Sequence, residues 1–307
     1  NHSTETALLT MTDRILEAMD RKQVALLCML DLSKCFDVIP HDRLLVKLEQ
    51  YGVDTRRFTS YLDEHYQQVV IRSPDGRSAL SQPLANTIGT YQGSALGPLL
   101  FSVYANDMPL FQPDDNSHTT CLVQYCDDTQ LAVMGSPRDA GALVACMEHN
   151  LAALGDWLRK NGLKVNADKT QLMVVGTRQS VRQLPDISVQ FMNTTVMPSP
   201  TAKNLGVTFD ATLSFDVHVS DVVRRCTGVL SGLCHSRHYL PRDTLVTLVQ
   251  ALAVSTVRYA ISVYGVCGIT QTRRLQRLLN FGTRVVSGPR KFDHISDVMR
   301  DLQWLSA

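Results

Sequence analysis

The chain has 307 residues, 44% of them hydrophobic, and a formal net charge of +1. A chain of this size and composition can bury a large core, so a disordered protein is excluded and roughly two domains or subdomains are expected. No apolar run approaches the roughly 20 residues needed to span a bilayer, and no signal peptide is seen, so we expect an intracellular protein without a membrane partner.

Charge is unevenly distributed along the chain. Residues 203–307 hold 13 lysines and arginines against 7 acidic residues, whereas residues 1–202 hold 17 against 22. A basic C-terminal third suits contact with phosphates, and an acidic body can hold cations. Ordinary charge scatter is the alternative. The eight cysteines form no CxxC pair and lie mostly in apolar runs, which indicates reduced, buried thiols.

The first 106 residues predict helices and short strands in alternation. Apolar residues recur at helical spacing over 3–20, and Ser3 or Thr4 can cap the resulting amphipathic helix. The apolar run Val24–Leu30 is short enough for a buried strand and ends at Asp31. The pattern then predicts a helix at 41–50 with Gly52 as its stop signal, a strand at 67–71, a turn at 74–76, a second hairpin-like arm closing at 88–93 and a helix at 96–106.

The remaining residues change from a mixed pattern to a helical one. Two short strands are expected within 122–134, then a long helix over 138–161, short strands at 172–175 and 207–209, and helices from about 217 almost to the end. This order predicts an α+β fold in which a mostly antiparallel sheet carries helices on one face, followed by an all-α part. We place the two domains at 1–212 and 213–307.

Two adjacent acids interrupt apolar strands at Tyr125-Cys126-Asp127-Asp128. Neighbouring carboxylates repel each other and burial raises the cost, so such a pair is tolerated where a cation relieves the repulsion. A hairpin turn at 126–129 would bring both acids to one site, and Asp31 can join them at the sheet edge. Carboxylates suit Mg²⁺, and two such ions can serve nucleotidyl transfer. A solvated turn is the alternative when the Asp-Asp pair is taken by itself.

Five blocks in fixed order surround these acids. They read LDLSKCFDVIPHDRLLVKL, YQGSALGPLLFSVYANDMP, QYCDDTQL, WLRKNGLKVNADKTQLMV and KNLGVTFDATLSFDVHV, at residues 30–48, 91–109, 124–131, 157–174 and 203–219. With the later stretches at 257–265 and 275–288, they resemble the reverse transcriptases of non-LTR (LINE-type) retrotransposons over nearly the whole chain. The resemblance implies a right-hand polymerase palm at 1–212 with partial fingers, and a helical thumb and C-terminal region at 213–307.

The resemblance also implies catalytic roles. Asp31, Asp127 and Asp128 correspond to the carboxylates that hold two Mg²⁺ ions, for which Mn²⁺ can substitute, and the Leu32 carbonyl is a helper ligand. Lys169 is the candidate to protonate or neutralise the leaving pyrophosphate, because a lysine supplies charge where phosphate charge develops. A solvated loop lysine is the alternative reading of Lys169.

Further positions correspond to the binding of nucleotide and primer. Phe36 occupies the position of a sugar gate, where a ring would clash with a 2′-hydroxyl; a core aromatic is the alternative. Gln92, Gly93 and Ser94 would contact the incoming nucleotide and the template base, or form a plain helix-capping turn. Leu205-Gly206 would grip the primer 3′ end, or form a simple turn that leads into a strand.

The implied partners are an RNA template, a DNA primer and a dNTP, and nuclear action follows from how such elements integrate. Arginines of the C-terminal helices could neutralise duplex phosphates. Tyr91 and Cys126 depart from the proline and alanine usual in the family, and both are tolerable. The match begins inside the fingers region and no endonuclease precedes it, so we expect weak or no polymerase activity from residues 1–307 alone.

Two other functions share these features. The first is a catalytically silent, nucleic-acid-binding remnant of the same fold, which the intact carboxylates argue against and the start of the match argues for. The second is another metal-dependent phosphotransfer enzyme such as a nuclease, which needs the carboxylates but neither Phe36 nor the 92–94 turn. The choice between dNTP and rNTP, when Phe36 is changed, distinguishes a polymerase from both.

Overall fold

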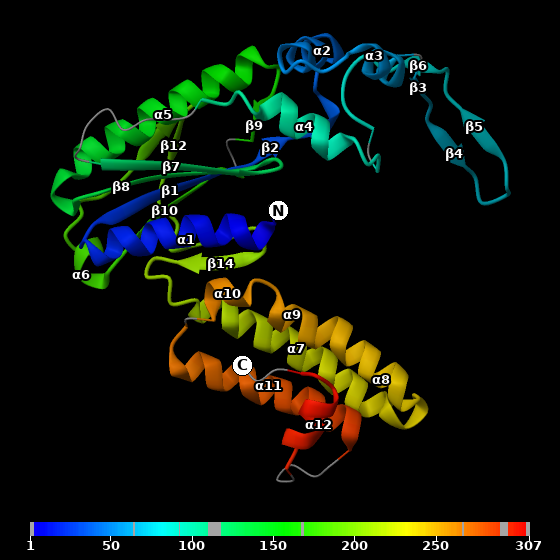
Figure 1. Cartoon of the computed structure of the whole chain (residues 1–307), viewed down its shortest axis with the longest axis vertical. Helices are drawn as coiled ribbons and strands as arrows, with labels where there is room; N and C mark the ends of the chain where they lie inside the picture. The colour runs from blue at the N-terminus through cyan, green and yellow to red at the C-terminus, as the bar shows by residue number, and fades with distance from the viewer. Residues whose placement is uncertain are drawn as a thin grey trace.

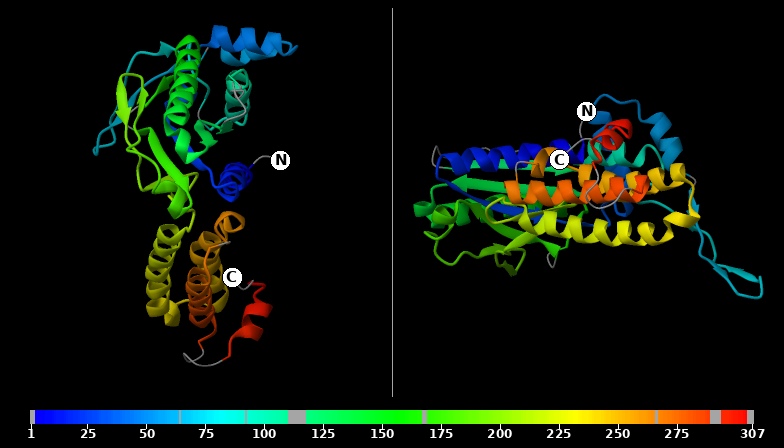
Figure 2. Two further views of the ribbon diagram at one scale, coloured as in Figure 1. Left: turned by 90° about the vertical axis from the view of Figure 1, so that its left-hand side faces the viewer. Right: turned by 90° about the horizontal axis from the view of Figure 1, so that it is seen from below.

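The computed structural model describes residues 3–63, 65–91, 93–109, 118–166, 169–265, 267–288 and 294–304. Strands and helices alternate up to residue 210, and every described element after that is helical. Figure 1 shows the sheet with its helices at one end of the molecule and the C-terminal helices at the other. Figure 2 shows the same ribbon from two further directions. None of the described helices has the length and apolar character needed to cross a bilayer.

A four-stranded antiparallel sheet forms the centre of the first part, in the order β10-β1-β8-β7. The strands are β1 (Val24–Leu30), β7 (His118–Tyr125), β8 (Asp128–Gly135) and β10 (Gln171–Gly176). The middle strand β1 is buried at all seven positions. Its apolar side chains alternate between two core clusters, with Leu26 on one face of the sheet and Leu27 on the other.

Helices cover both faces of this sheet, which corrects the expectation of helices on one face only. Helix α1 (Thr4–Asp20) contributes to one core cluster, and α5 (Ala140–Lys160) contributes to the other. The reason lies in β1, because a strand that is apolar at every position must be covered on both sides. Helix α1 begins where the sequence predicted, with Ser3 and Thr6 forming a capping box.

The segment between β1 and β7 carries three helices and a projecting arm. The helices are α2 (His41–Gln50), α3 (Arg56–Leu62) and α4 (Gly97–Ala105). The arm pairs β3 (Tyr66–Gln67) with β6 (Leu84–Ala85), and β4 (Val70–Arg72) with β5 (Ser78–Leu80). It extends away from the body in Figure 1 and turns at 74–76 as predicted. The arm closes at β6 and not at 88–93, where the sequence predicted the end of a second arm. Ile88 makes an isolated bridge to Pro40.

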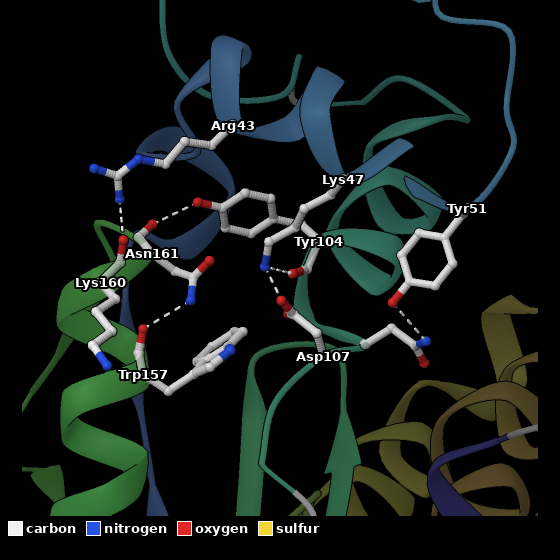
Figure 3. Close-up of polar contacts among 9 residues, drawn as sticks. Arg43, Lys47, Tyr51, Tyr104, Asp107, Trp157, Lys160 and Asn161 are labelled. Carbon is white, nitrogen blue, oxygen red and sulfur yellow. Dashed lines mark hydrogen bonds and ion pairs between the residues drawn. The ribbon is translucent and has the colours of Figure 1, made fainter. Parts of the chain in front are cut away.

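One lysine joins α2, α4 and α5 (Figure 3). The Nζ atom of Lys47 donates to the Tyr104 carbonyl and to Asp107 Oδ1, both at 2.6 Å. The same ammonium lies 4.3 Å and 4.9 Å from the ring centroids of Tyr104 and Trp157. A buried charge is costly unless it is paired and hydrogen-bonded, and Lys47 has both kinds of partner. This junction fixes the helices against which the 36–39 segment packs.

Short hairpins lead from the sheet to the C-terminal helices. They are β11 (Val189–Phe191) with β12 (Thr194–Val196), and β13 (Thr201–Asn204) with β14 (Val207–Asp210). Before them in the chain, β2 (Leu32–Ser33) pairs with the distant strand β9 (Lys164–Val165), and helix α6 (Arg178–Val181) follows β10. The Asp210 carboxylate ends the last strand and accepts hydrogen bonds from the backbone amides of Thr212, Ser214 and Phe215. Burial acts to raise the pKa of Asp210, but bonds from Ser214 and Thr212 outweigh it and hold the pKa below its ordinary value.

The C-terminal part contains only helices among the residues described. They are α7 (Asp216–Ser236), α8 (Arg242–Val249), a π-helical turn (Gln250–Val254), α9 (Ser255–Arg258), α10 (Ile261–Tyr264), α11 (Ile269–Ser287) and α12 (Ser296–Asp301). Their apolar faces share one core cluster with α1 and one face of the sheet. The two parts are therefore packed together through a continuous core.

His218 is buried where α7 packs on β14. Its Nδ1 accepts a hydrogen bond from the Thr208 amide at 3.3 Å, and its ring meets Tyr264 edge-on with 4.8 Å between centroids. Burial is the main cause that lowers the pKa of His218, aided by the charges of Arg225 and Lys203 and opposed by Asp221. The neutral ring is thus the form that the fold stabilises.

Acidification is expected to weaken the fold through His218. The unfolded histidine binds a proton near pH 6.5 and the folded one only at lower pH, so stability is full above that pH. It falls as the pH drops below it, by up to about 1.4 kcal/mol per pH unit. Urea unfolding between pH 7.5 and 5 measures this slope. His218→Gln should remove this contribution, whereas His235→Gln, at an exposed position on the same helix, should keep it. Equal slopes in both variants would contradict the assignment.

Candidate active site

Three carboxylates meet at one end of the central sheet. Asp31 directly follows β1, and the β7–β8 hairpin turns through Cys126 and Asp127 before Asp128 opens β8. The antiparallel register sets Leu30 opposite Thr129 and Tyr125 opposite Asp128, so all three acids lie at the same strand ends. Cys126 has a φ of +52°, as a two-residue hairpin turn of this kind requires. The predicted turn at 126–129 is thus confirmed, with two residues in the loop.

The three carboxylates act on one another electrostatically. Burial raises the pKa of Asp128, and the charges of Asp127 and Asp31 raise it further. The field of Asp127 also helps burial raise the pKa of Cys35 to about 12. Negative charge is therefore concentrated in a half-buried site, where it costs stability unless a cation is present.

Lys169 lies against this cluster. Its Nζ is 3.2 Å from Asp31 Oδ2, and the side chains are 66% and 37% exposed. The backbone supports the approach, because the Asn166 amide donates to the Asp31 carbonyl at 3.0 Å. Asn166 is thus bonded to the residue that follows β1, and the Lys169 side chain remains largely exposed to solvent.

The donor set fits a hard divalent cation. All three acids offer oxygen ligands, which Mg²⁺ prefers, and their mutual repulsion would be relieved by positive charge. Among the described residues, no three or more His, Cys, Asp or Glu side chains are already arranged as a set of metal ligands. Asp31 makes an ion pair with Lys169 in this arrangement. The three carboxylates therefore interact electrostatically, but they are not arranged as a rigid, preformed set of metal ligands.

Phe36 lies beside the segment that leads to the 92–94 turn. The Thr90 amide donates to the Phe36 carbonyl at 2.6 Å, and the Gly89 amide donates to the Ile39 carbonyl at 2.7 Å. The Phe36 ring packs on Phe101 of α4, with 4.9 Å between centroids. These contacts bring two blocks that are more than 50 residues apart to the same side of the site. Sequence reasoning passed over Gly89, although it precedes the turn by only a few residues.

Two of the three residues of the predicted nucleotide-binding turn are described. Gly93 has a φ of +83°, which glycine adopts without strain, and Ser94 Oγ accepts from the Gly97 amide at 3.0 Å at the start of α4. Gln92 lies outside the described residues. Ser94 thus accepts from the first amide of α4, but the N-cap position itself is Leu96, which makes no side-chain cap bond. This geometry is compatible with either reading of the turn.

Leu205 and Gly206 form the two-residue turn of the β13–β14 hairpin, with φ of +43° and +87°. Tyr259, at the end of α9, donates its hydroxyl to the Leu205 carbonyl at 2.6 Å. A Cβ on residue 206 would stand 3.1 Å from the Tyr259 ring. Tyr259 was missed from sequence because it lies in the late block 257–265, which gave no hint of a partner 54 residues upstream.

Known proteins resemble this chain over most of its length. Residues 2–209 match the family model described as reverse transcriptase (RNA-dependent DNA polymerase). The chain is 27% identical over 98% of its length to the RNA-directed DNA polymerase from mobile element jockey of Drosophila melanogaster, and 28% identical over 98% to a probable RNA-directed DNA polymerase from transposon BS of that species. It spans about a third of each relative, 32% and 33%.

Solved telomerase structures also align with the chain. A Candida albicans telomerase with a telomeric RNA fragment matches with a TM-score of 0.37 and 12% identity, covering 99% of this chain and 54% of that one. A Candida tropicalis telomerase gives 0.41 and 11%, covering 97% and 53%. The family model and the mobile-element relatives, together with the carboxylates at the sheet edge, show that the chain belongs to the reverse transcriptase (RNA-dependent DNA polymerase) family, of the kind found in non-LTR retrotransposons.

Proposed function

We propose that this chain carries out RNA-directed DNA synthesis, extending a DNA primer on an RNA template with dNTPs. The observation that supports it most is that Asp31, Asp127 and Asp128 lie together at one end of the central strands, with Lys169 beside Asp31. We place residues 1–212 as palm with partial fingers and 213–307 as thumb and C-terminal region. The change from strands to helices between Asp210 and Asp216 supports this boundary. Its place of action would be the nucleus, where a DNA target is available.

The three carboxylates, with the Leu32 carbonyl, would hold two Mg²⁺ ions. Bound ions of this kind activate an attacking hydroxyl and stabilise a leaving oxygen. Burial is the main cause of the raised pKa of Asp128, so this carboxylate suits the orientation of the site. Asp31, after the end of β1, and Asp127, in the hairpin turn, would be the shared ligands.

Lys169 would serve the leaving group. Its ammonium is held near the carboxylates by Asp31, yet the side chain is 66% exposed and can turn toward a triphosphate. A lysine there would stabilise the negative charge that develops on pyrophosphate and could hand it a proton. Gln92, Gly93 and Ser94, which precede α4 in the chain, would contact nucleotide and template, and Leu205-Gly206 would hold the primer end.

The proposal is tested by primer extension under single-turnover conditions. The full chain, in excess over a DNA primer annealed to RNA, is mixed with one dNTP and Mg²⁺ or Mn²⁺. We expect slow addition of the templated deoxynucleotide. Binding of the primer–template without any addition would favour the silent nucleic-acid-binding remnant. Degradation of the strands in place of addition would favour a nuclease.

Phe36→Val is expected to relax the choice between dNTP and rNTP. A smaller side chain would no longer clash with a 2′-hydroxyl, and one group's difference in fit is worth about 10- to 100-fold in selectivity. The measurement is the ratio of single-nucleotide incorporation rates for dNTP and rNTP. Phe58→Val is the matched control, because Phe58 packs on the same core cluster from α3. An unchanged ratio in an active Phe36→Val protein would leave Phe36 as a core aromatic only.

A further inference from the structure

Two buried amides connect the catalytic hairpin to the 205–206 turn. Asn204 Nδ2 donates to Gln130 Oε1 at 2.8 Å, and the two residues are 3% and 1% exposed. Gln130 lies in β8 and Asn204 ends β13, so the bond joins two separate sheets across 74 residues of sequence. Both residues lie in blocks of the sequence described above, but neither was given a role there, and neither belongs to the carboxylate site.

Each of the two amides lies close in sequence to a residue of the proposed site. Gln130 follows Asp128 by two residues in β8, so the two side chains point to the same face of the strand. Asn204 immediately precedes Leu205, whose carbonyl accepts from the Tyr259 hydroxyl at 2.6 Å. The thumb, the primer-side turn and the catalytic strand are thereby joined in one series of contacts: Tyr259 to Leu205, then Asn204 to Gln130.

Burying these two amides lowers the stability of the fold. This argues that their hydrogen bond serves to fix geometry and not to stabilise the protein. The same face of β8 carries apolar Ala132 and Met134 into a core cluster, so an amide at 130 is surrounded by apolar groups. Gln130 Nε2 is buried and has no hydrogen-bond partner among the residues that the structure describes. An unsatisfied buried donor is destabilising, whereas replacing both partners by apolar groups can be neutral or stabilising.

We propose that Gln130 and Asn204 are positioning residues, whose hydrogen bond sets the Asp127-Asp128 hairpin at a fixed distance from the turn that holds the primer end. This inference rests on the proposed function for its kinetic consequence. In-line transfer requires the primer hydroxyl and the carboxylate-bound ions to be placed together, and a displacement of about 1 Å can cost roughly 10²-fold in rate. A directional bond between two strands specifies such a distance better than apolar packing does.

The test uses the full chain in three variants: Asn204→Leu, Gln130→Met and the double variant. The double variant replaces both buried amides by apolar side chains and leaves no unsatisfied donor at this site. Hydrogen exchange is followed separately in peptides covering 122–132 and 201–207. We expect Asn204→Leu to raise exchange at least tenfold in the catalytic hairpin, and Gln130→Met to do so in the 201–207 segment. Effects confined to the strand that carries each substitution would overturn the proposal.

The kinetic readout separates positioning from folding. The double variant is expected to unfold at a urea concentration no lower than wild type, to bind primer–template with unchanged Kd, and to add a nucleotide at least tenfold more slowly. Gln190→Met is the matched control: it removes a side-chain bond between Gln190 and Thr195 in the β11–β12 hairpin and should leave the rate unchanged. A double variant that adds nucleotide at the wild-type rate would overturn the proposal.

Failure of the proposed function would look different. A wild-type chain that binds primer–template but adds no nucleotide counts against polymerase activity, and the exchange measurements then decide the Gln130–Asn204 connection by themselves. If one single variant does not fold, the other single variant carries the exchange readout, and the double variant, which leaves no lone buried amide, carries the rate readout.

Discussion

Replacing Asp127 by asparagine is expected to lower the rate of nucleotide addition at least about 10³-fold, which is about 4 kcal/mol of transition-state stabilisation. The same change should leave the folded state as stable as wild type, or more stable, when no divalent ion is added. The physical reason is the raised pKa of Asp128, to which the Asp127 charge contributes after burial. Removing one charge relieves a repulsion that the fold otherwise bears.

The rate of nucleotide addition must fall while the stability of the folded state does not. Single-turnover extension gives the rate, and urea unfolding in the presence of a chelator gives the stability. Asp156→Asn is the control, because Asp156 is an exposed acid on α5 that makes an ion pair with Arg159. A loss of activity accompanied by an equal loss of stability would mean that Asp127 supports the hairpin turn and not the chemistry.

Gly89→Ala is expected to destabilise the protein by about 2–5 kcal/mol, from a strained left-handed backbone and from overpacking. Gly89 has a φ of +85°, and an added Cβ would stand 2.7 Å from the Asp37 carbonyl oxygen. Backbone atoms cannot move aside as a flexible side chain can. The segment would have to separate from 36–39 and lose the bonds of Gly89 and Thr90, so the nucleotide selection proposed for Phe36 should suffer as well.

Gly76→Ala separates strain from collision. Gly76 shares the φ of +85° but has no atom within 4 Å of an added Cβ, since it lies at the tip of the exposed arm. It should cost about 1–2 kcal/mol, the backbone strain by itself. Urea unfolding of both variants measures the difference. Equal losses would show that the approach of Gly89 to Asp37 contributes nothing.

The local secondary structure could largely be predicted from the sequence. The apolar run Val24–Leu30 forms β1 with those bounds, and 41–50 forms α2 as predicted. Asp31 at the end of a strand and the acids in a tight turn could be predicted because strand ends and turns are set by neighbouring residues. Their meeting at one sheet edge needed only the assumption of antiparallel pairing, which the register confirms.

What the sequence did not predict depends on contacts between distant residues. Lys47 looks like an ordinary solvated lysine of an amphipathic helix, yet it is buried against Tyr104 and Asp107. The Gln130–Asn204 bond and the Tyr259 contact likewise join strands and helices far apart in sequence. Periodicity reports which face of an element is apolar and not which element will cover it. For the same reason the second helical layer on the sheet was missed.

Binding of Mn²⁺ to the full chain tests the central claim most directly, because it needs no catalytic turnover. Free Mn²⁺ is followed by electron paramagnetic resonance as wild type, Asp127→Asn and Asp156→Asn are titrated in. If Asp31, Asp127 and Asp128 form a cation site, Asp127→Asn should weaken Mn²⁺ binding at least tenfold, and Asp156→Asn should bind as wild type does. Equal Mn²⁺ binding by wild type and Asp127→Asn would contradict the assignment of these carboxylates as the catalytic centre.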